Sequence, residues 1–312
     1  MFFVILNIVA PVFLVIVAGF AAVRSGLFAD AMIDGVMRFA VLFAVPCLLF
    51  RAVSTLKLGD AFDWRLVLAF YSGALISFTL ASTVARRWFG RKPGEAVAVG
   101  FVALFSNLLL LGLPISERAW GRDELAPVYA IVSLHAPFCY LVGISVMEWL
   151  RSDGRSGWET ARIIGSAMFR NSLMIGIGLG FLVNFSGLVL PEALGAAIDL
   201  LARAALPAAL FALGGVLARY RLKQTLGEVS MVTLMSLFVH PLLVYLICLL
   251  LGVEQQQLRK VVLMAAMAPG LNSYLFAVLY QRGQETAAST VLLATVLSVG
   301  TVSLWLWWLM PV

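Results

Sequence analysis

The sequence predicts an all-α integral membrane protein of about ten transmembrane helices, arranged as two inverted five-helix repeats in which helices four and nine are broken. Three observations predict this fold: the composition, the spacing of the apolar runs, and matching motifs in the two halves. The chain is 62% hydrophobic and 12% charged over 312 residues, whereas a soluble domain carries about 25% charged residues. Too few polar groups remain to face water on all sides, so much of the surface must face lipid.

The charge and the cysteines exclude several other classes of protein. The net charge of +6 includes no basic stripe with interleaved aromatic residues, so we expect no nucleic-acid partner. Cys47, Cys139 and Cys248 lie inside apolar runs without paired spacing. They are typical of small core residues, so we expect no disulfide framework, no metal site and no resident cofactor.

Apolar runs near the ~20 residues that a helix needs to cross a bilayer recur along the whole chain. The ten predicted spans cover residues 4–23, 33–53, 64–84, 96–117, 126–149, 171–190, 194–217, 229–251, 260–280 and 288–310.

The longest polar stretch divides the chain into two halves. We predict a first repeat at 1–150, a cytoplasmic connecting loop at 151–170, and a second, inverted repeat at 171–312. Fourteen of the 22 Lys and Arg residues lie in loops after odd-numbered spans or, for Arg38, near the start of the span that follows. The positive-inside rule makes those loops cytoplasmic and both termini non-cytoplasmic. Because each half has five spans, the second half must enter the membrane with reversed polarity.

The second and seventh spans share a motif that supports this repeat. Residues 45–50 read Val-Pro-Cys-Leu-Leu-Phe and residues 206–211 read Leu-Pro-Ala-Ala-Leu-Phe, at an offset of 161 residues. Proline removes a backbone donor and crowds the preceding turn. We therefore expect Pro46 and Pro207 to bend equivalent helices rather than contact a substrate.

The fourth and ninth spans combine polar residues with helix-breaking ones at mid-membrane depth. The fourth holds Ser106, Asn107, Gly112 and Pro114, and the ninth holds Pro269, Gly270, Asn272, Ser273 and Tyr274. We predict that both helices break here. Backbone groups freed by a break cannot face lipid and must line an enclosed cavity. Interrupted spans at matching places in two halves indicate a transporter's substrate site.

The N-termini of broken helices carry partial positive charge and free N–H groups, which suit a carboxylate. We predict that Asn107 and Asn272 contact such an anion, with Ser106, Ser273 and Tyr274 beside them. The alternative is that both asparagines only satisfy backbone groups freed by the breaks.

Other polar residues in the spans are open to two readings. His135 could contact the anion or shuttle a proton, or it could make an interhelical hydrogen bond. For His240, next to Pro241, a structural role is favoured. Asp199 and Arg203 are expected to pair at a spacing of four residues. No Asp or Glu lies unpaired in mid-membrane, so coupling to H⁺, coupling to Na⁺ and uncoupled exchange all stay open.

Taken together, these motifs resemble the auxin efflux carrier family, which includes the plant PIN proteins and bacterial carriers labelled malonate transporters. Asn171-Ser172 departs from the Asn-Pro of many relatives. The resemblance spans the whole chain and rests on Pro-x-x-Leu-Phe at 46–50, Ser106-Asn107 with Gly112-x-Pro114, Leu206-Pro207 with Gly214 and Gly215, His240-Pro241, and Pro269 with Asn272.

The resemblance implies a secondary transporter of a small organic anion, a malonate-like or auxin-like mono- or dicarboxylate. It implies that helices 4 and 9 cross at their breaks. It also implies an elevator-type mechanism, in which helices 3–5 and 8–10 move against a scaffold of helices 1, 2, 6 and 7. It also implies a homodimer through that scaffold and a place in the bacterial inner membrane. The substrate, the direction of transport and the coupling ion are not specified.

Three other classes of function were weighed. An intramembrane protease is disfavoured because the chain lacks His-Glu-x-x-His and Gly-x-Ser-x-Gly motifs, so we expect no enzyme. An anion channel would need similar polar residues within the membrane, and saturable counterflow separates it from a carrier. A membrane receptor or sensor is the third alternative, although no soluble output domain is attached.

Overall fold

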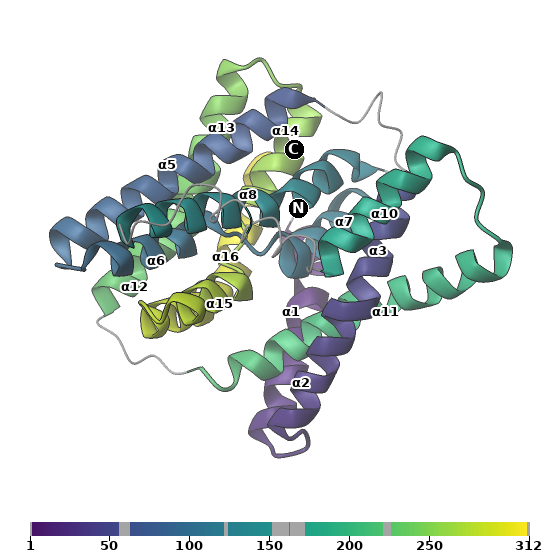
Figure 1. Cartoon of the computed structure of the whole chain (residues 1–312), viewed down its shortest axis with the longest axis horizontal. Helices are drawn as coiled ribbons and strands as arrows, with labels where there is room; N and C mark the ends of the chain where they lie inside the picture. The colour runs from purple at the N-terminus through teal and green to yellow at the C-terminus, as the bar shows by residue number, and fades with distance from the viewer. Residues whose placement is uncertain are drawn as a thin grey trace. The chain divides into compact units, whose positions relative to one another are not determined.

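The computed structural model describes residues 2–55, 63–121, 124–151, 162, 172–220 and 226–310, and it is helical throughout those segments (Figure 1). Within them, seven helices are long and apolar enough to cross a membrane. These helices are Phe3–Arg24, Asp30–Ser54, Trp64–Trp88, Ala126–Leu150, Glu192–Leu217, Leu226–Leu250 and Gln284–Leu309. The predicted spans 96–117, 171–190 and 260–280 hold shorter helices instead. An all-helical integral membrane protein is therefore confirmed, whereas ten spans and the inversion stay predictions.

The chain divides into two compact units, each assembled from separate stretches of sequence. The first contains residues 1–10, 63–160 and 220–312, and the second contains 11–62 and 161–219. In terms of the predicted spans, the first unit holds spans 3–5 and 8–10, and the second holds most of spans 1, 2, 6 and 7. This is the grouping that the family resemblance implies. The division at 1–150, 151–170 and 171–312 stays a prediction, and most of the connecting loop lies outside the described residues.

The second unit contains most of α1 (Phe2–Arg24) together with four further helices. They are α2 (Asp30–Phe39), α3 (Val45–Ser54), α10 (Ser172–Ser186) and α11 (Glu192–Leu217), with the π-helical turn η1 (Ala40–Ala44) between α2 and α3. The helices α10 and α11 both pack on α3. A Cβ atom at Gly214 of α11 would overlap the carbonyl oxygen of Ile16 in α1. Only glycine lets these two backbones approach so closely, as is common between membrane helices.

The first unit is built around α5 (Trp64–Trp88), which packs against α6 (Pro93–Leu104) and α13 (His240–Leu250), as Figure 1 shows. The remaining elements are η2 (Leu108–Gly112), α7 (Leu113–Trp120), α8 (Ala126–Arg151), α12 (Leu226–Leu234), η4 (Met235–Val239), α14 (Gln255–Ala265), α15 (Leu271–Tyr280) and α16 (Gln284–Leu309). The helix α8 packs on α6, and α16 packs on both α12 and α15.

Several helix boundaries in the first half of the chain recur in the second half at a constant offset. The segment 64–88 of α5 reappears as 226–250, and the start of α6 at 93 reappears as the start of α14 at 255. The segment that begins with α2 at 30 likewise reappears as α11 at 192. All three starts are separated by 162 residues, one more than the offset of the shared Pro-x-x-Leu-Phe motif. A constant offset is what the predicted repeat requires, and the repeat itself stays a prediction.

Three prolines follow a π-helical turn rather than a broken helix. Pro46, Pro114 and Pro241 each come two residues after η1, η2 and η4, respectively. In each case, the residue before the proline donates its N–H to the carbonyl five residues earlier. The wider turn relieves the clash between the proline ring and the preceding carbonyl. Pro207, by contrast, lies inside the α-helix α11.

Ion pairs tie together segments of the first unit. Glu228 is fully buried and accepts hydrogen bonds from Arg91, at 2.6 Å, and from Thr286, at 2.9 Å. This carboxylate raises the pKa of the Arg91 guanidinium. Elsewhere, Lys260 donates to Glu124 at 2.7 Å and lowers the pKa of that exposed carboxyl. Arg91 and Glu124 precede helices α6 and α8, and Glu228 lies in the first turn of α12, whereas Lys260 lies in the middle of α14.

Candidate functional site

The fourth and ninth predicted spans cross in the first unit, at two short extended segments. The N–H of Asn107 donates to the carbonyl of Ala268 at 2.8 Å, and the N–H of Gly270 donates to the carbonyl of Phe105 at 2.9 Å. These bonds pair Ser106 with Pro269 as an isolated antiparallel bridge. Backbone groups freed by two broken helices thus satisfy each other, as the apolar surroundings require.

The first break lies between α6 and η2, and Asn107 caps the helix that follows it. Its side-chain oxygen accepts a hydrogen bond from the N–H of Leu110 at 3.2 Å, and its carbonyl accepts from Leu111 and Gly112. The side chain is buried, with 6% exposed. Its amide nitrogen has no hydrogen-bond partner among the described residues, so two N–H bonds remain available to a ligand.

The second break separates α14 from α15 and carries no side-chain cap. Gly270 occupies the N-cap position, and Asn272 is the second residue of α15. The Asn272 side chain is half-buried and makes no hydrogen bond to any described residue. The N–H groups of Leu271 and Asn272 lie in the first turn, where a helix offers no partner of its own. This end therefore presents unpaired donors and the positive end of a helix dipole.

The neighbouring polar residues divide into those that support the break and those that lie beside it. Ser273 is buried, and its hydroxyl donates to the carbonyl of Gly270 at 2.7 Å. Tyr274 is half-buried and packs on Tyr220 with the ring centroids 5.1 Å apart. Ser273 thus holds the start of α15 in place, whereas Tyr274 flanks it.

Gly112 and Pro114 were expected at the break of the fourth span, and the structure places them outside it. Gly112 ends η2, and Pro114 lies in the first turn of α7. The chain breaks earlier, at 105–107, because a π-helical turn accommodates Pro114 without interrupting the helix. The expectation for the ninth span is met, since Pro269 and Gly270 lie in the break itself. A Cβ atom at Gly270 would lie 3.4 Å from the Cα atom of Asn107, so the backbones are in close contact.

Both histidines of the chain reach the first break from different helices. The Nε2 atom of His135, in α8, lies 3.1 Å from the carbonyl oxygen of Ser106. The Nδ1 atom of His240, at the start of α13, lies 3.4 Å from the hydroxyl of the same serine. Sequence reasoning favoured a structural role for His240 and missed this convergence. The two histidines meet only because spans 4, 5 and 8 pack together in the folded protein.

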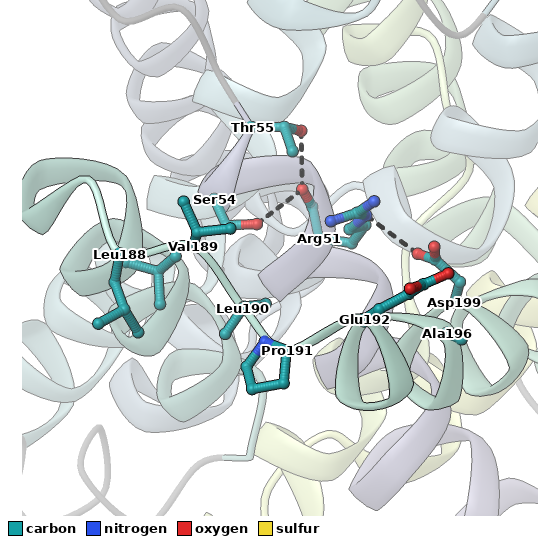
Figure 2. Close-up of a pocket in the computed structure, with 12 residues that line it drawn as sticks. Arg51, Ser54, Thr55, Leu188, Val189, Leu190, Pro191, Glu192, Ala196 and Asp199 are labelled. Atoms are coloured by element: carbon teal, nitrogen blue, oxygen red, sulfur yellow. Dashed lines mark hydrogen bonds and ion pairs between the residues drawn. The ribbon is translucent and has the colours of Figure 1, made fainter.

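A second candidate site is a pocket of about 460 Å³ in the second unit, drawn in Figure 2. Arg51 extends toward Asp199 and pairs with it at 3.0 Å, while the hydroxyls of Ser54 and Thr55 donate to the Arg51 carbonyl. The expected pair of Asp199 with Arg203 is wrong, because packing of α3 on α11 brings Arg51 closer. With Glu192 also in the lining, carboxylates outnumber cations, so this pocket disfavours an anion.

Comparison with known proteins places the chain among transporters. The membrane transport protein family matches residues 4–306. A protein of Rhizobium meliloti, provisionally named a malonate transporter, is 26% identical over 95% of this chain and 93% of its own length. An uncharacterised transporter of Methanothermobacter thermautotrophicus is 24% identical over 95% of this chain and 96% of its own. The uncharacterised transporter YfdV of Escherichia coli K12 is 20% identical, with 95% of each chain covered.

The family match extends over both breaks and nearly all of the helices described above. The relatives are covered almost from end to end, so the likeness concerns whole proteins rather than one shared segment. The chain therefore belongs to the membrane transport protein family, the auxin efflux carrier group that its motifs resemble.

Proposed function

We propose that this protein is a secondary transporter of a small organic anion, with the crossover as its substrate site. The observation that carries the proposal is the pair of amide groups beside the two breaks. The amide nitrogen of Asn107 and the whole side-chain amide of Asn272 have no hydrogen-bond partner in the described part of the chain. Both lie next to helix N-termini, which attract a carboxylate. No formal positive charge is needed, because aligned N–H donors and helix dipoles supply the attraction.

A malonate-like dicarboxylate is the first substrate to test. The provisional name of the Rhizobium meliloti relative supports this choice. The crossover also suits a dicarboxylate, since two breaks offer two sets of donors. A monocarboxylate would use one set and would bind more weakly.

We propose an elevator-type mechanism in which the first unit carries the anion and moves against the second. The first unit contains the entire crossover, so the substrate site would travel as one body. The second unit contains the close glycine contacts of α1 with α11, which suit a rigid scaffold. Homodimer formation through spans 1, 2, 6 and 7 follows from the family resemblance and belongs to this proposal.

The same proposal places the protein in a bacterial inner membrane with both termini outside the cytoplasm. The distribution of Lys and Arg between the loops supports this orientation. A reporter fused after Val312 is expected to read as non-cytoplasmic, and one inserted near Gly154 as cytoplasmic. Reversal of either reading would contradict the inverted repeat.

The decisive experiment is counterflow in proteoliposomes. Liposomes loaded with unlabelled malonate are expected to take up external radiolabelled malonate transiently and saturably, because exchange through a carrier needs no gradient of total substrate. A panel of labelled mono- and dicarboxylates in the same assay ranks the substrates. A channel would conduct without counterflow, and a receptor would bind malonate without moving it.

The Asn272→Ala variant links counterflow to the crossover, and Asn184→Ala is the matched control. Asn184 lies in α10 of the second unit, where its amide donates to the carbonyls of Val53 and Ser54. The same substitution outside the crossover is expected to leave the concentration for half-maximal counterflow unchanged. Equal loss in both variants would place the substrate site elsewhere.

A further inference from the structure

The two histidines of this chain meet at one serine of the crossover, although 105 residues separate them in sequence. His135 and His240 are both buried, with 3% and 0% exposed. The carbonyl of Ser106 can only accept a hydrogen bond, so the Nε2 atom of His135 is the protonated one in the neutral ring. Its Nδ1 atom then faces the thiol of Cys139 at 3.7 Å. His135 is therefore engaged on both sides.

His240 is held less completely than His135. Its Nδ1 atom has one long contact, with the Ser106 hydroxyl. Its Nε2 atom is buried without a hydrogen-bond partner in the described part of the chain. The backbone carbonyls of Phe70 and Ala265 nevertheless lie close to the ring. These groups would accept a hydrogen bond from the second N–H that His240 acquires on protonation.

The position of His240 within the crossover also favours a positive charge. Ala265 is the last residue of α14, so its carbonyl belongs to the negative end of that helix dipole. The helices that begin after the breaks present positive ends to the two asparagines. The crossover thus has one side suited to a cation and another suited to an anion.

Among the residues that the structure describes, no carboxylate approaches the ring of His240. The groups that approach its ring from α5, from α14 and from the first break are Phe70, Gly73, Ala265 and Ser106, and none of them is charged. Of the described titratable groups, His135 reaches the same serine as His240, and Cys139 and Tyr71 contact His135. Among the described residues, the buried charged side chains are Glu228 and Lys260, which pair with Arg91 and Glu124.

We propose that His240 binds a proton together with the transported anion, so that the protein is an anion–proton symporter. This inference rests on the proposed function, because the anion is the counter-charge that a protonated His240 needs. Each ligand favours binding of the other by the same factor, as linkage requires. The proton comes from water on the loading side and returns to water on the release side, so no other reactant is consumed.

The first test uses the parent protein in proteoliposomes with malonate as the probe and the membrane potential clamped. An inward proton gradient of one pH unit is expected to drive accumulation of malonate up to about tenfold above that without a gradient, for one proton per anion. An internal pH dye should report acidification during uptake. Counterflow that occurs with no response to the proton gradient overturns the symport proposal and leaves the proposed function intact. Absence of any counterflow overturns the proposed function, and this inference with it.

The second test identifies the residue through the pH dependence of malonate affinity in detergent. From about pH 8 to about pH 7, where malonate stays a dianion, the affinity of the parent is expected to rise up to about tenfold. His240→Gln, whose amide keeps polarity without titrating, should bind with an affinity that does not change with pH. His135→Gln is the matched control and should keep the pH dependence of the parent. Loss of pH dependence in His135→Gln alone would overturn the assignment to His240.

The parent's response to the gradient decides whether symport occurs even if His240→Gln does not fold. In that case Ser106→Ala provides a second test of the assignment to His240. It removes the hydroxyl beside the Nδ1 atom of His240 but keeps the carbonyl that His135 uses. A shift in the midpoint of the pH dependence supports His240, and an unchanged midpoint contradicts it.

Discussion

The two breaks of the crossover differ in how the helix that follows each of them is capped. At the first break, a side chain does the capping: Asn107 accepts the N–H of Leu110 and is buried. At the second break, Gly270 occupies the cap position and offers no side chain, while Asn272 is the second residue of the helix that follows and makes no hydrogen bond to any described residue. The two asparagines look alike in the sequence, yet one is partly committed to the fold and the other is not.

This difference separates two interpretations that the sequence leaves open. One holds that the asparagines bind an anion, and the other that they satisfy freed backbone groups. The side-chain oxygen of Asn107 accepts a freed backbone N–H, as the second interpretation states, while its amide nitrogen stays available to bind an anion, as the first requires. Asn272 has no structural partner among the described residues, so the case for ligand binding is strongest there. Substitutions at the two sites should accordingly affect different measurements.

The largest expected effect is on ligand affinity at the second break. Asn272→Ala should weaken malonate binding by roughly ten- to a hundred-fold, because it removes one charge-assisted hydrogen bond of ~1.5–3 kcal/mol. Its thermal stability should match the parent, since no described residue loses a hydrogen bond. Isothermal titration calorimetry and a thermal melt of the same monodisperse sample check both statements. Parent-like affinity in a well-folded variant would remove Asn272 from the site.

At the first break, the expected effect is mainly on stability. Asn107→Ala removes the helix cap and should cost about 0.5–2 kcal/mol of unfolding free energy, measured by thermal or denaturant unfolding. Affinity should fall as well, because the amide nitrogen is lost along with the oxygen. A variant that binds weakly but unfolds like the parent would contradict the capping role.

Asn107→Asp separates the two roles of Asn107. A carboxylate oxygen can still accept the N–H of Leu110, so stability should recover toward that of the parent. Binding of malonate should nevertheless fall below that of Asn107→Ala, because the new charge repels an anion at the helix N-terminus. If Asn107→Asp binds better than Asn107→Ala, the ligand at this position is a cation.

Sequence reasoning predicted the all-helical membrane fold and the breaks in the fourth and ninth spans, because apolar length and Gly/Pro interruptions are local signals. The crossing of these two spans was expected only from the family resemblance. Sequence reasoning located the first break only within the stretch that holds Ser106, Asn107, Gly112 and Pro114, since a proline alone does not reveal whether the helix ends or widens into a π-helical turn. It also missed the Arg51–Asp199 pair and the meeting of both histidines at Ser106. These contacts depend on which helices pack together, and spacing along one chain does not encode that choice.

The smallest expected effect concerns the support of the second break by Ser273. Its hydroxyl donates to the carbonyl of Gly270, which also accepts the N–H of the same serine. Ser273→Ala therefore removes one of two hydrogen bonds and should cost about 0.5–1.5 kcal/mol of stability. The carbonyl stays paired, so the start of α15 should keep its place and malonate affinity should change less than threefold, about 0.6 kcal/mol. A tenfold loss of affinity, measured by calorimetry on a folded sample, would show that the serine contacts the ligand directly. The second break would then hold two ligand-binding side chains, and its contrast with the first would be greater than the hydrogen bonds alone indicate.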